Sequence, residues 1–456
     1  MKLRMKRPVL FCVAIAAWGG ANADVPLDLP VSFGTEMQSP EAVVAAGFNS
    51  FCSGLISLPN KTSDQIQLAD ICSQVATSDP TDTADVFAAV SARAMSAETT
   101  SASRGVAVDL RGGVEKRLSS LLRMATLKTS SAQPVEFYFD GRWIPASWVT
   151  AAAEDAANAS STSAEPEGLL SQRWGGFFDL GLMKEKQDEA VTQAGFKSNI
   201  DGLTAGADYR LQNNAYAGGA IRYRSVSGDL NYSTGSVKGA DTTLTLYGAY
   251  FATPKFILQT ALIYAAGGID LTRNISFDLA GVPTTATAKS TANTTRTGIS
   301  VDGYYNFDFG NGGVLSTSAS LLYGNTSIDP FVEKGAGGFN LKVDGQSTNS
   351  TTLNISAQYT HAISTSFAVV IPELSGTVVK ELVTDPQQVT ASFAADPSQT
   401  SFHYQITKRD DLYGNVGLGA TCVFTKGRSG FVRYEQLVGY DKFKASSFSL
   451  GGRMEF

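Results

Sequence analysis

Few residues of this chain could carry out chemistry, and the two histidines come first. His403 lies near Asp410 and Asp411 in the sequence, and a histidine beside a carboxylate can activate water for hydrolysis. His361 falls in a short predicted turn, where we expect a structural or solvated role. The sequence contains no HExxH zinc motif, no CxxC pair, no G-x-S-x-G motif and no phosphate-binding glycine loop. We therefore assign no catalytic, cofactor-binding or metal-binding residue, and keep a hydrolase centred on His403 as an alternative.

The N-terminus has the three parts of a secretory signal peptide. A basic start at Lys2–Arg7 precedes the apolar run Pro8–Trp18, and Ala21-Asn22-Ala23 forms a small-residue cleavage site before Asp24. An N-terminal anchor helix fits less well, because the apolar run is too short to span a bilayer. We predict cleavage between Ala23 and Asp24, and export of the mature chain to an oxidising compartment.

Export changes what the cysteines can do. Cys52 and Cys72 fall in one helical region and could close a loop that stabilises the fold by roughly 3 kcal/mol. The alternative is a pair of buried free thiols. Cys422 lies on the same apolar face of a predicted strand as Val416, Leu418 and Phe424, so we interpret it as a small hydrophobic residue that faces lipid.

Helical patterns dominate the region before residue 132. Apolar residues recur at helical spacing from Ser39 to about Leu55, and Thr62 with Gln65 forms a capping-box pattern for a second helix. A short third helix carries Val86, Phe87 and Val90, and an amphipathic segment follows at 102–124. We expect a small helical unit here.

The segment 132–171 differs from the region before it. Phe137–Ile144 reads as a hairpin with an Asp140-Gly141 turn. An Ala-rich stretch at 147–158 could form a helix, and a linker rich in Ser, Ala and Pro follows at 159–167.

The end of the chain alternates with a period of two. Phe448, Leu450, Gly452, Met454 and Phe456 are apolar or glycine, whereas the residues between them are small or charged. This is the pattern of a strand with two different faces. In a membrane barrel the apolar face meets lipid and the polar face meets a wet lumen.

Similar alternation begins at Arg173 and continues to the end of the chain. The tracts are 173–182, 203–211, 217–224, 242–251, 256–268, 295–307, 313–328, 349–360, 366–383, 411–425, 431–440 and 447–456. They predict an all-β transmembrane barrel of about 12 antiparallel strands, preceded by a small helical N-terminal region. A closed barrel satisfies every strand hydrogen bond, which lipid requires.

The predicted connections alternate in length. The short ones are Gln212–Ala215, Ala252–Lys255, Asp308–Gly312, His361–Thr365 and Lys426–Ser429, and the long ones are 184–200, 227–241, 269–294, 329–348 and 384–410. Outer-membrane barrels place short turns on the periplasmic side and long loops outside. The even strand count then puts both ends of the barrel in the periplasm.

Charged residues fall on the polar face of these strands. The predicted lumen charges are Asp208, Arg210, Arg222, Arg224, Asp302, Glu373, Arg433 and Glu435. They could line a selective channel, but we expect them to pair across the interior and to hold a plug segment. The stretch 147–158 is the first choice for that plug, and the basic helix 102–124 is the other candidate.

Several stretches, in their order along the chain, resemble the translocator barrel of autotransporters, the type V secretion family. They are Arg173–Phe178, Gly202–Arg210, Phe256–Arg273, Leu322–Phe331 and Gly452–Phe456. The resemblance covers about residues 168–456, and the hairpin at 137–144 and the segment 102–124 resemble the region before such barrels. It implies a twelve-stranded barrel with a helix in the pore, whose N-terminal passenger is carried to the cell surface.

The resemblance also implies partners. Phe456, together with Phe448, Leu450 and Met454, is similar to the signal read by the barrel-assembly machinery, and periplasmic chaperones would escort the chain. Outer-membrane lipid surrounds the barrel, and we expect a monomer. The net charge of −6 argues against nucleic acid as a partner.

The expected organisation has four parts. A signal peptide (1–23) precedes a helical, passenger-like region (24–131), a segment with the hairpin, plug candidate and linker (132–171) and the barrel (172–456). We expect a non-enzymatic protein of the Gram-negative outer membrane that translocates or displays its own N-terminal region, either at the cell surface or in the pore. The alternatives are a porin-like diffusion channel and the hydrolase.

Overall fold

The computed structural model describes residues 40–78, 80–91, 127–128, 136–139, 142–145 and 174–455, with short gaps in the last range at 191–193, 213, 232–233, 254, 310–312, 366, 384–387, 407–409 and 425–427. Several predictions lie outside the described residues: the signal peptide with Ala23 and Asp24, the helix at 102–124, the plug candidate at 147–158, the linker, and Phe456. Among the described helices, none is both long and apolar enough to cross a bilayer.

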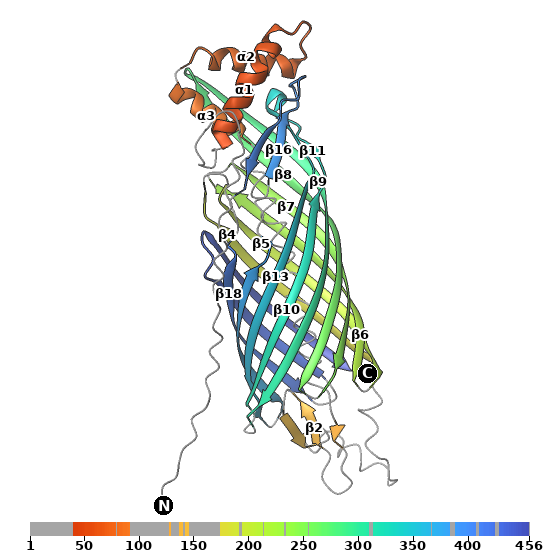
Figure 1. The fold of residues 1–456 in the computed structure, drawn as a ribbon. Coiled ribbons are helices and arrows are strands. Elements are labelled where there is room, and N and C mark those ends of the chain that lie inside the picture. The colour runs from red at the N-terminus through yellow and green to blue at the C-terminus, as the bar shows by residue number, and fades with distance from the viewer. Residues whose placement is uncertain are drawn as a thin grey trace, which may run out of the picture. The chain divides into compact units, whose positions relative to one another are not determined.

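Twelve of the described strands form a closed antiparallel barrel (Figure 1). They are β4 (Trp174–Gln187), β5 (Phe196–Gln212), β6 (Ala215–Leu230), β7 (Gly235–Phe251), β8 (Phe256–Leu279), β9 (Val282–Asp308), β10 (Gly313–Ile328), β13 (Gln346–His361), β15 (Val369–Glu381), β18 (Leu412–Phe424), β19 (Arg428–Val438) and β20 (Phe443–Glu455). The pairs β20–β4 and β13–β15 close the ring. The two-residue strand β14 (Ile363–Ser364) pairs with the first two residues of β15. The predicted barrel of about 12 strands is confirmed.

An apolar belt surrounds the barrel because alternate side chains point outward. Each of the twelve strands contributes exposed large apolar residues to the belt, for example Leu182, Leu203, Ile221, Leu246, Leu262, Val301, Leu321, Ile355, Leu374, Leu418, Tyr434 and Phe448. On β8 these residues end at Tyr264, so the lipid-facing stretch is Phe256–Tyr264. That length agrees with the roughly 9–11 residues that a tilted strand needs to cross a bilayer.

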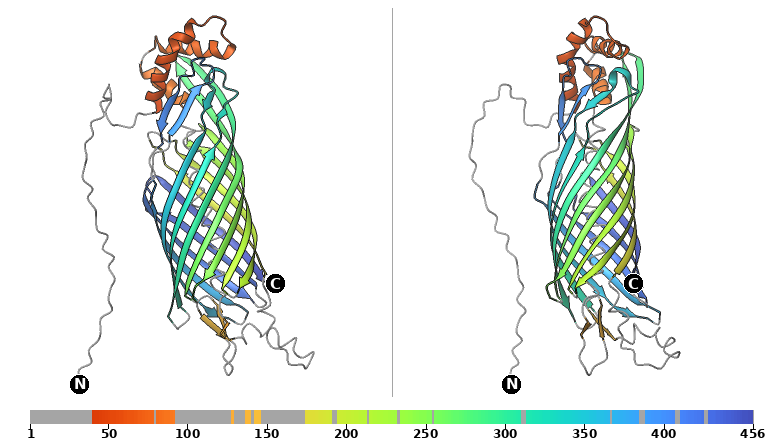
Figure 2. Two further views of the ribbon diagram at one scale, coloured as in Figure 1. Left: turned by 45° about the vertical axis from the view of Figure 1, so that its right-hand side comes forward. Right: turned by 90° about the vertical axis from the view of Figure 1, so that its right-hand side faces the viewer.

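Beyond Gly267 the outward face of β8 changes character. Its side chains become polar and mostly exposed, whereas the inward side chains stay buried and, apart from Arg273, are large and apolar. The inward set is Leu271, Ile275, Phe277 and Leu279, and the outward set is Asp270, Asn274, Ser276 and Asp278. The strand has therefore left the apolar belt, and its inner face joins an ordinary protein core. Figure 2 shows β8 and β9 extending past the neighbouring strands.

The predicted loop at 269–294 is thus wrong. The ladder between β8 and β9 continues without a shift to the pair Leu279 and Val282. Ala280 and Gly281 form the turn with φ values of 53° and 80°, and the Gly281 N–H donates a hydrogen bond of 2.8 Å to Oδ1 of Asp278. Glycine suits this turn because a side chain is strained at positive φ.

The other predicted long loops are also shorter or more ordered than expected. The described strands leave only 188–195 between β4 and β5, and 231–234 between β6 and β7. Residues 329–348 and 384–410 contain a separate sheet of four short strands in the order β11-β12-β16-β17, which we call the cap sheet. Its elements are β11 (Phe331–Val332), β12 (Leu341–Val343), β16 (Gln388–Phe393) and β17 (Phe402–Gln405), with the 3₁₀ turn η3 (Gly337–Phe339) before β12. The five predicted short turns do connect consecutive barrel strands.

Three helices form the described N-terminal region: α1 (Pro40–Ser57), α2 (Ser63–Val75) and α3 (Pro80–Val90). The capping box is present, because Thr62 accepts a hydrogen bond from the Gln65 N–H and the Gln65 side chain accepts one from the Thr62 N–H. Cys52 and Cys72 form the predicted disulfide between α1 and α2. The predicted hairpin is also present as β2 (Glu136–Phe139) and β3 (Arg142–Pro145), with β1 (Leu127–Lys128) beside β2.

A charge introduced into the apolar belt tests this assignment of faces. We expect Leu262→Arg to destabilise the folded barrel in lipid vesicles by about 2–4 kcal/mol, because the side chain lies within the belt. Ser276→Arg is the matched control, since Ser276 lies on the same face of β8 beyond the belt and should change stability little. Urea unfolding in vesicles measures both, and equal effects of the two substitutions would contradict the belt.

Candidate functional site: barrel interior and cap

The topology separates two rims of the barrel. β4 begins and β20 ends at one rim, where Gly175 pairs with Glu455, and the five short turns lie at that rim. The β8–β9 turn and the cap sheet lie at the other rim (Figures 1 and 2). Helices α1–α3 contact this second rim through β8, β17 and η3.

The predicted lumen charges lie on the inward face, and several of them have partners there. Asp208 is buried and accepts a hydrogen bond of 3.3 Å from the Tyr247 hydroxyl. Arg210 donates to the Tyr216 hydroxyl at 2.9 Å, and Ser300 donates to Asp302 at 3.0 Å.

Other predicted charges pair with acidic residues across neighbouring strands. Arg224 lies 2.7 Å from Asp241, whose second oxygen lies 2.6 Å from Arg296. Arg433 pairs with Glu373, which also accepts a hydrogen bond of 2.7 Å from Gln358. Removing one partner of such a buried ion pair destabilises the fold, because it leaves an uncompensated charge.

Sequence reasoning missed Asp241, Arg296 and Arg453 among these residues. Arg453 lies 3.6 Å from Asp208 and 2.5 Å from Glu455, so it links the last strand to the interior network. All three occupy inward positions of the same two-residue alternation. Extending each predicted strand by a few residues and counting every charge on its polar face would have found them.

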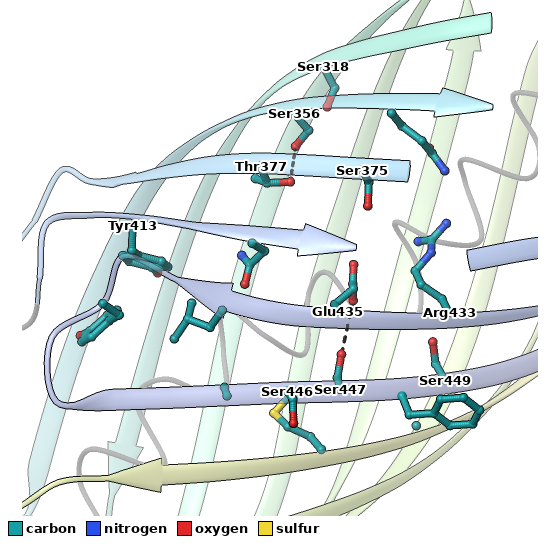
Figure 3. A pocket seen from close by; sticks show the side chains of 18 of the residues that line it. Ser318, Ser356, Ser375, Thr377, Tyr413, Arg433, Glu435, Ser446, Ser447 and Ser449 are labelled. Atoms are coloured by element: carbon teal, nitrogen blue, oxygen red, sulfur yellow. Dashed lines mark hydrogen bonds between the residues drawn. The ribbon is translucent and has the colours of Figure 1, made fainter. Parts of the chain in front are cut away.

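Several hydroxyl groups line one cavity of the interior, beside the charged side chains of Arg433 and Glu435 (Figure 3). Ser318, Ser356, Ser375 and Thr377 from β10, β13 and β15 line a cavity of about 200 Å³, together with Ser447 and Ser449 of β20. Ser356 and Thr377 share a hydrogen bond of 2.9 Å, and Ser447 donates to Glu435 at 3.4 Å. Arg222 also lines this cavity. The cavity lining thus combines hydroxyl groups with charged side chains.

The hydrolase alternative requires His403 to contact Asp410 or Asp411, but the hydrogen bond found for His403 is with Thr390. His403 lies on β17 and shares a hydrogen bond of 2.9 Å with Thr390 on β16. Lys380 donates to Asp411 at 2.5 Å, and Asp410 accepts a hydrogen bond from the Asp441 N–H. His361 ends β13 opposite Gly313. Within the part of the chain that the structure describes, no group of three His, Cys, Asp or Glu residues is placed to hold a metal ion.

An exposed ion pair lies just beyond the end of β4. Lys186 donates a hydrogen bond to Asp188, and this bond together with the charges of Lys186 and Lys444 holds the pKa of Asp188 below its usual value. Solvent screens such a pair, so it contributes little to stability.

Helices α1–α3 share a hydrophobic core with the second rim, which carries the cap sheet. Phe48 of α1 is almost fully buried, and its ring centroid lies 5.3 Å from that of Phe393 on β16, nearly perpendicular to it. Phe393 also contacts Phe51 at 5.7 Å and Phe402 at 5.6 Å. Edge-to-face contacts of aromatic rings at such distances are favourable.

A buried arginine connects four elements beneath this core. Nη2 of Arg273 on β8 lies 2.6 Å from Oε2 of Glu333, and it also donates to the Phe339 carbonyl of η3 at 2.8 Å. Nη1 donates to the Ala89 carbonyl of α3 at 3.4 Å. Glu333 in turn accepts a hydrogen bond of 2.8 Å from the Leu341 N–H of β12.

Cys422 and the predicted assembly signal both lie on the barrel wall. Cys422 occupies the same face of β18 as the exposed Leu418 and Phe424 and is itself half-buried. Phe448, Leu450 and Met454 are exposed on β20, beside the seam with β4.

Comparisons with known proteins agree with this architecture. A sequence model of the autotransporter beta-domain matches residues 180–435, which is more than half of the chain. The translocator domain of the autotransporter NalP from Neisseria meningitidis aligns with 68% of this chain and 99% of its own, at 16% identity and a TM-score of 0.50.

The beta domain of the Bordetella autotransporter BrkA aligns with 62% of this chain and 100% of its own, at 19% identity and a TM-score of 0.45. A comparison with curated proteins found no match. The belt, the ring of twelve strands and the matched beta-domain lead to one assignment: this chain belongs to the autotransporter family and carries its translocator β-barrel, a structure of the Gram-negative outer membrane.

Proposed function

We propose that the barrel carries the N-terminal region of its own chain across the outer membrane and holds α1–α3 at the cell surface. The observation that supports this most directly is the shared core of α1 with β16 and β17 at the rim opposite the barrel ends. In outer-membrane barrels the rim with short turns faces the periplasm. Helices bound to the other rim would therefore face the outside.

An epitope inserted between Pro59 and Asn60 tests this orientation. These residues connect α1 and α2 and are exposed, so the insertion should not disturb the core. We expect an antibody to bind the epitope on intact cells. The matched control places the same epitope in the turn between β7 and β8 at Thr253, where binding should require permeabilised cells. The reverse result for the two sites would contradict the proposal.

The same proposal includes assembly and the absence of catalysis. We propose that the barrel-assembly machinery reads Phe448, Leu450, Met454 and Phe456, which is supported by the outward position of the first three on the closing strand. The role is transport and display without a chemical step, in keeping with the contact of His403 with Thr390 and the pairing of Asp411 with Lys380.

A further inference from the structure

We infer that α1–α3 are a resident part of the barrel, bound to the outer rim by non-covalent contacts that persist when the connecting chain is cut. The surface formed by the cap sheet, η3 and the β8–β9 hairpin thus has a specific partner, namely residues 40–91 of the same chain. The inference rests on the proposed function for its location at the cell surface, but the binding itself can be tested separately.

The core of the helices is continuous with that of the rim. One continuous cluster of buried side chains contains residues from both sides of the contact. The helices contribute Val44, Phe48, Phe51, Leu55, Leu68, Ile71, Val86 and Val90. Strands β7 and β8 contribute Val237, Leu271, Ile275, Phe277 and Leu279, and η3 and the cap sheet contribute Phe339, Leu341, Val343, Val389, Phe393 and Phe402. Helices of 18, 13 and 11 residues are too short a unit to bury these side chains alone. Separation would expose both halves to water.

Helix α2 fits closely against η3. The Gly338 N–H donates a hydrogen bond of 2.9 Å to the Gln67 side chain. A Cβ atom added at Gly338 would lie 2.5 Å from the Asp64 carbonyl oxygen and 2.9 Å from the Leu68 nitrogen, which are backbone atoms of α2. The helix therefore rests directly on the backbone of η3, at a distance that only glycine permits.

Polar contacts and a disulfide fix the same arrangement. The Arg273 side chain bonds to the Ala89 carbonyl of α3 while it pairs with Glu333 of the barrel. The Cys52–Cys72 disulfide joins α1 to α2, so these two helices can leave the rim only together. Helices α2 and α3 thus form hydrogen bonds with η3 and β8, and the disulfide links α1 to α2.

The experiment uses the full-length protein with the recognition sequence of a site-specific protease inserted after Ser91. After cleavage, the helical fragment should elute with the barrel during gel filtration in detergent, and should sediment with the cells when intact cells are treated. Co-elution supports the inference. A fragment that elutes alone, or that appears in the medium of treated intact cells, overturns it.

Two substitutions show whether retention depends on the described contacts. Gly338→Val should raise the released fraction about tenfold or more, because overpacking against a backbone cannot be relieved by a side-chain rotation. Gly54→Ala is the matched control, since its Cβ would meet no atom within 4 Å. Val44→Asp, which leaves the barrel sequence unchanged, should also release the fragment. Retention in both Gly338→Val and Val44→Asp would overturn the inference.

The two proposals fail in different ways. Cleavage that requires permeabilised cells would contradict surface display, whereas co-elution in detergent would still support binding. Cleavage on intact cells followed by release would leave surface display intact and would overturn the residence of the helices.

Discussion

Replacing Arg273 by alanine is expected to accelerate amide hydrogen exchange in α1–α3 by about 10²-fold or more, while the strands within the apolar belt keep their protection. The side chains of Arg273 and Glu333 are 2% and 1% exposed, so the substitution leaves a buried carboxylate without its cation. Such a loss costs about 3–5 kcal/mol, and each 1.4 kcal/mol changes an equilibrium tenfold. Exchange measured by mass spectrometry in detergent micelles reports this change helix by helix.

Two further variants separate the charge from the packing at this position. Arg433→Ala removes an interior ion pair with Glu373 instead and should leave exchange in α1–α3 unchanged. The double variant Arg273→Met/Glu333→Leu should be more stable than Arg273→Ala, because no buried charge is left unpaired. Equal exchange in the double variant and in Arg273→Ala would show that the ion pair does not hold the helices.

The barrel was predictable because its signal is local and repeats along the chain. Each strand alternates between residues such as Leu418 and Leu450, which face outward, and small or polar inward residues such as Gly417 and Ser449. A period of two in the sequence is enough to identify such a strand. The capping box at Thr62 and the pair Cys52 and Cys72 were also predictable, since they depend on residues close in sequence.

The β8–β9 hairpin was missed although its alternation continues. Leu271, Ile275 and Phe277 alternate with polar residues, but these apolar side chains lie on the inward face, and the outward face carries polar residues from Asp270 on. A strand that is identified by an apolar lipid-facing side ends before this point, so 269–294 was predicted to be a loop. Alternation with a buried inward face and a polar outward face would have extended both strands correctly.

The cap sheet and its contact with α1–α3 had no comparable signal. β12 and β16 come from two different connections, and their pairing of Leu341 with Phe393 joins residues far apart in the sequence. Such pairs leave no periodic pattern in either segment. The aromatic cluster of Phe48, Phe393 and Phe402 likewise depends on three separate elements, so only the folded structure reveals it.

Phe393 gives the prediction that tests the cooperativity of this cluster. Phe393→Ala is expected to destabilise the helices and the cap sheet by about 3–5 kcal/mol, because the substitution leaves a cavity in a packed core. The side chain is 1% exposed and contacts aromatic rings from both α1 and β17. If the helices and the cap sheet unfold as one unit, amide hydrogen exchange should increase by a similar factor in α1 and in β17.

Phe178→Ala provides the control for Phe393→Ala, since Phe178 faces outward on β4 and is 53% exposed. It removes the same atoms from the apolar belt, and the exchange of α1 should not change. Faster amide exchange in β17 alone after Phe393→Ala would mean that other contacts stabilise α1 and that the helices and the cap sheet are not coupled. An equal increase in both would mean that the autotransporter barrel and its N-terminal helices fold into one structure at the outer rim, because neither side then keeps its protection without the other.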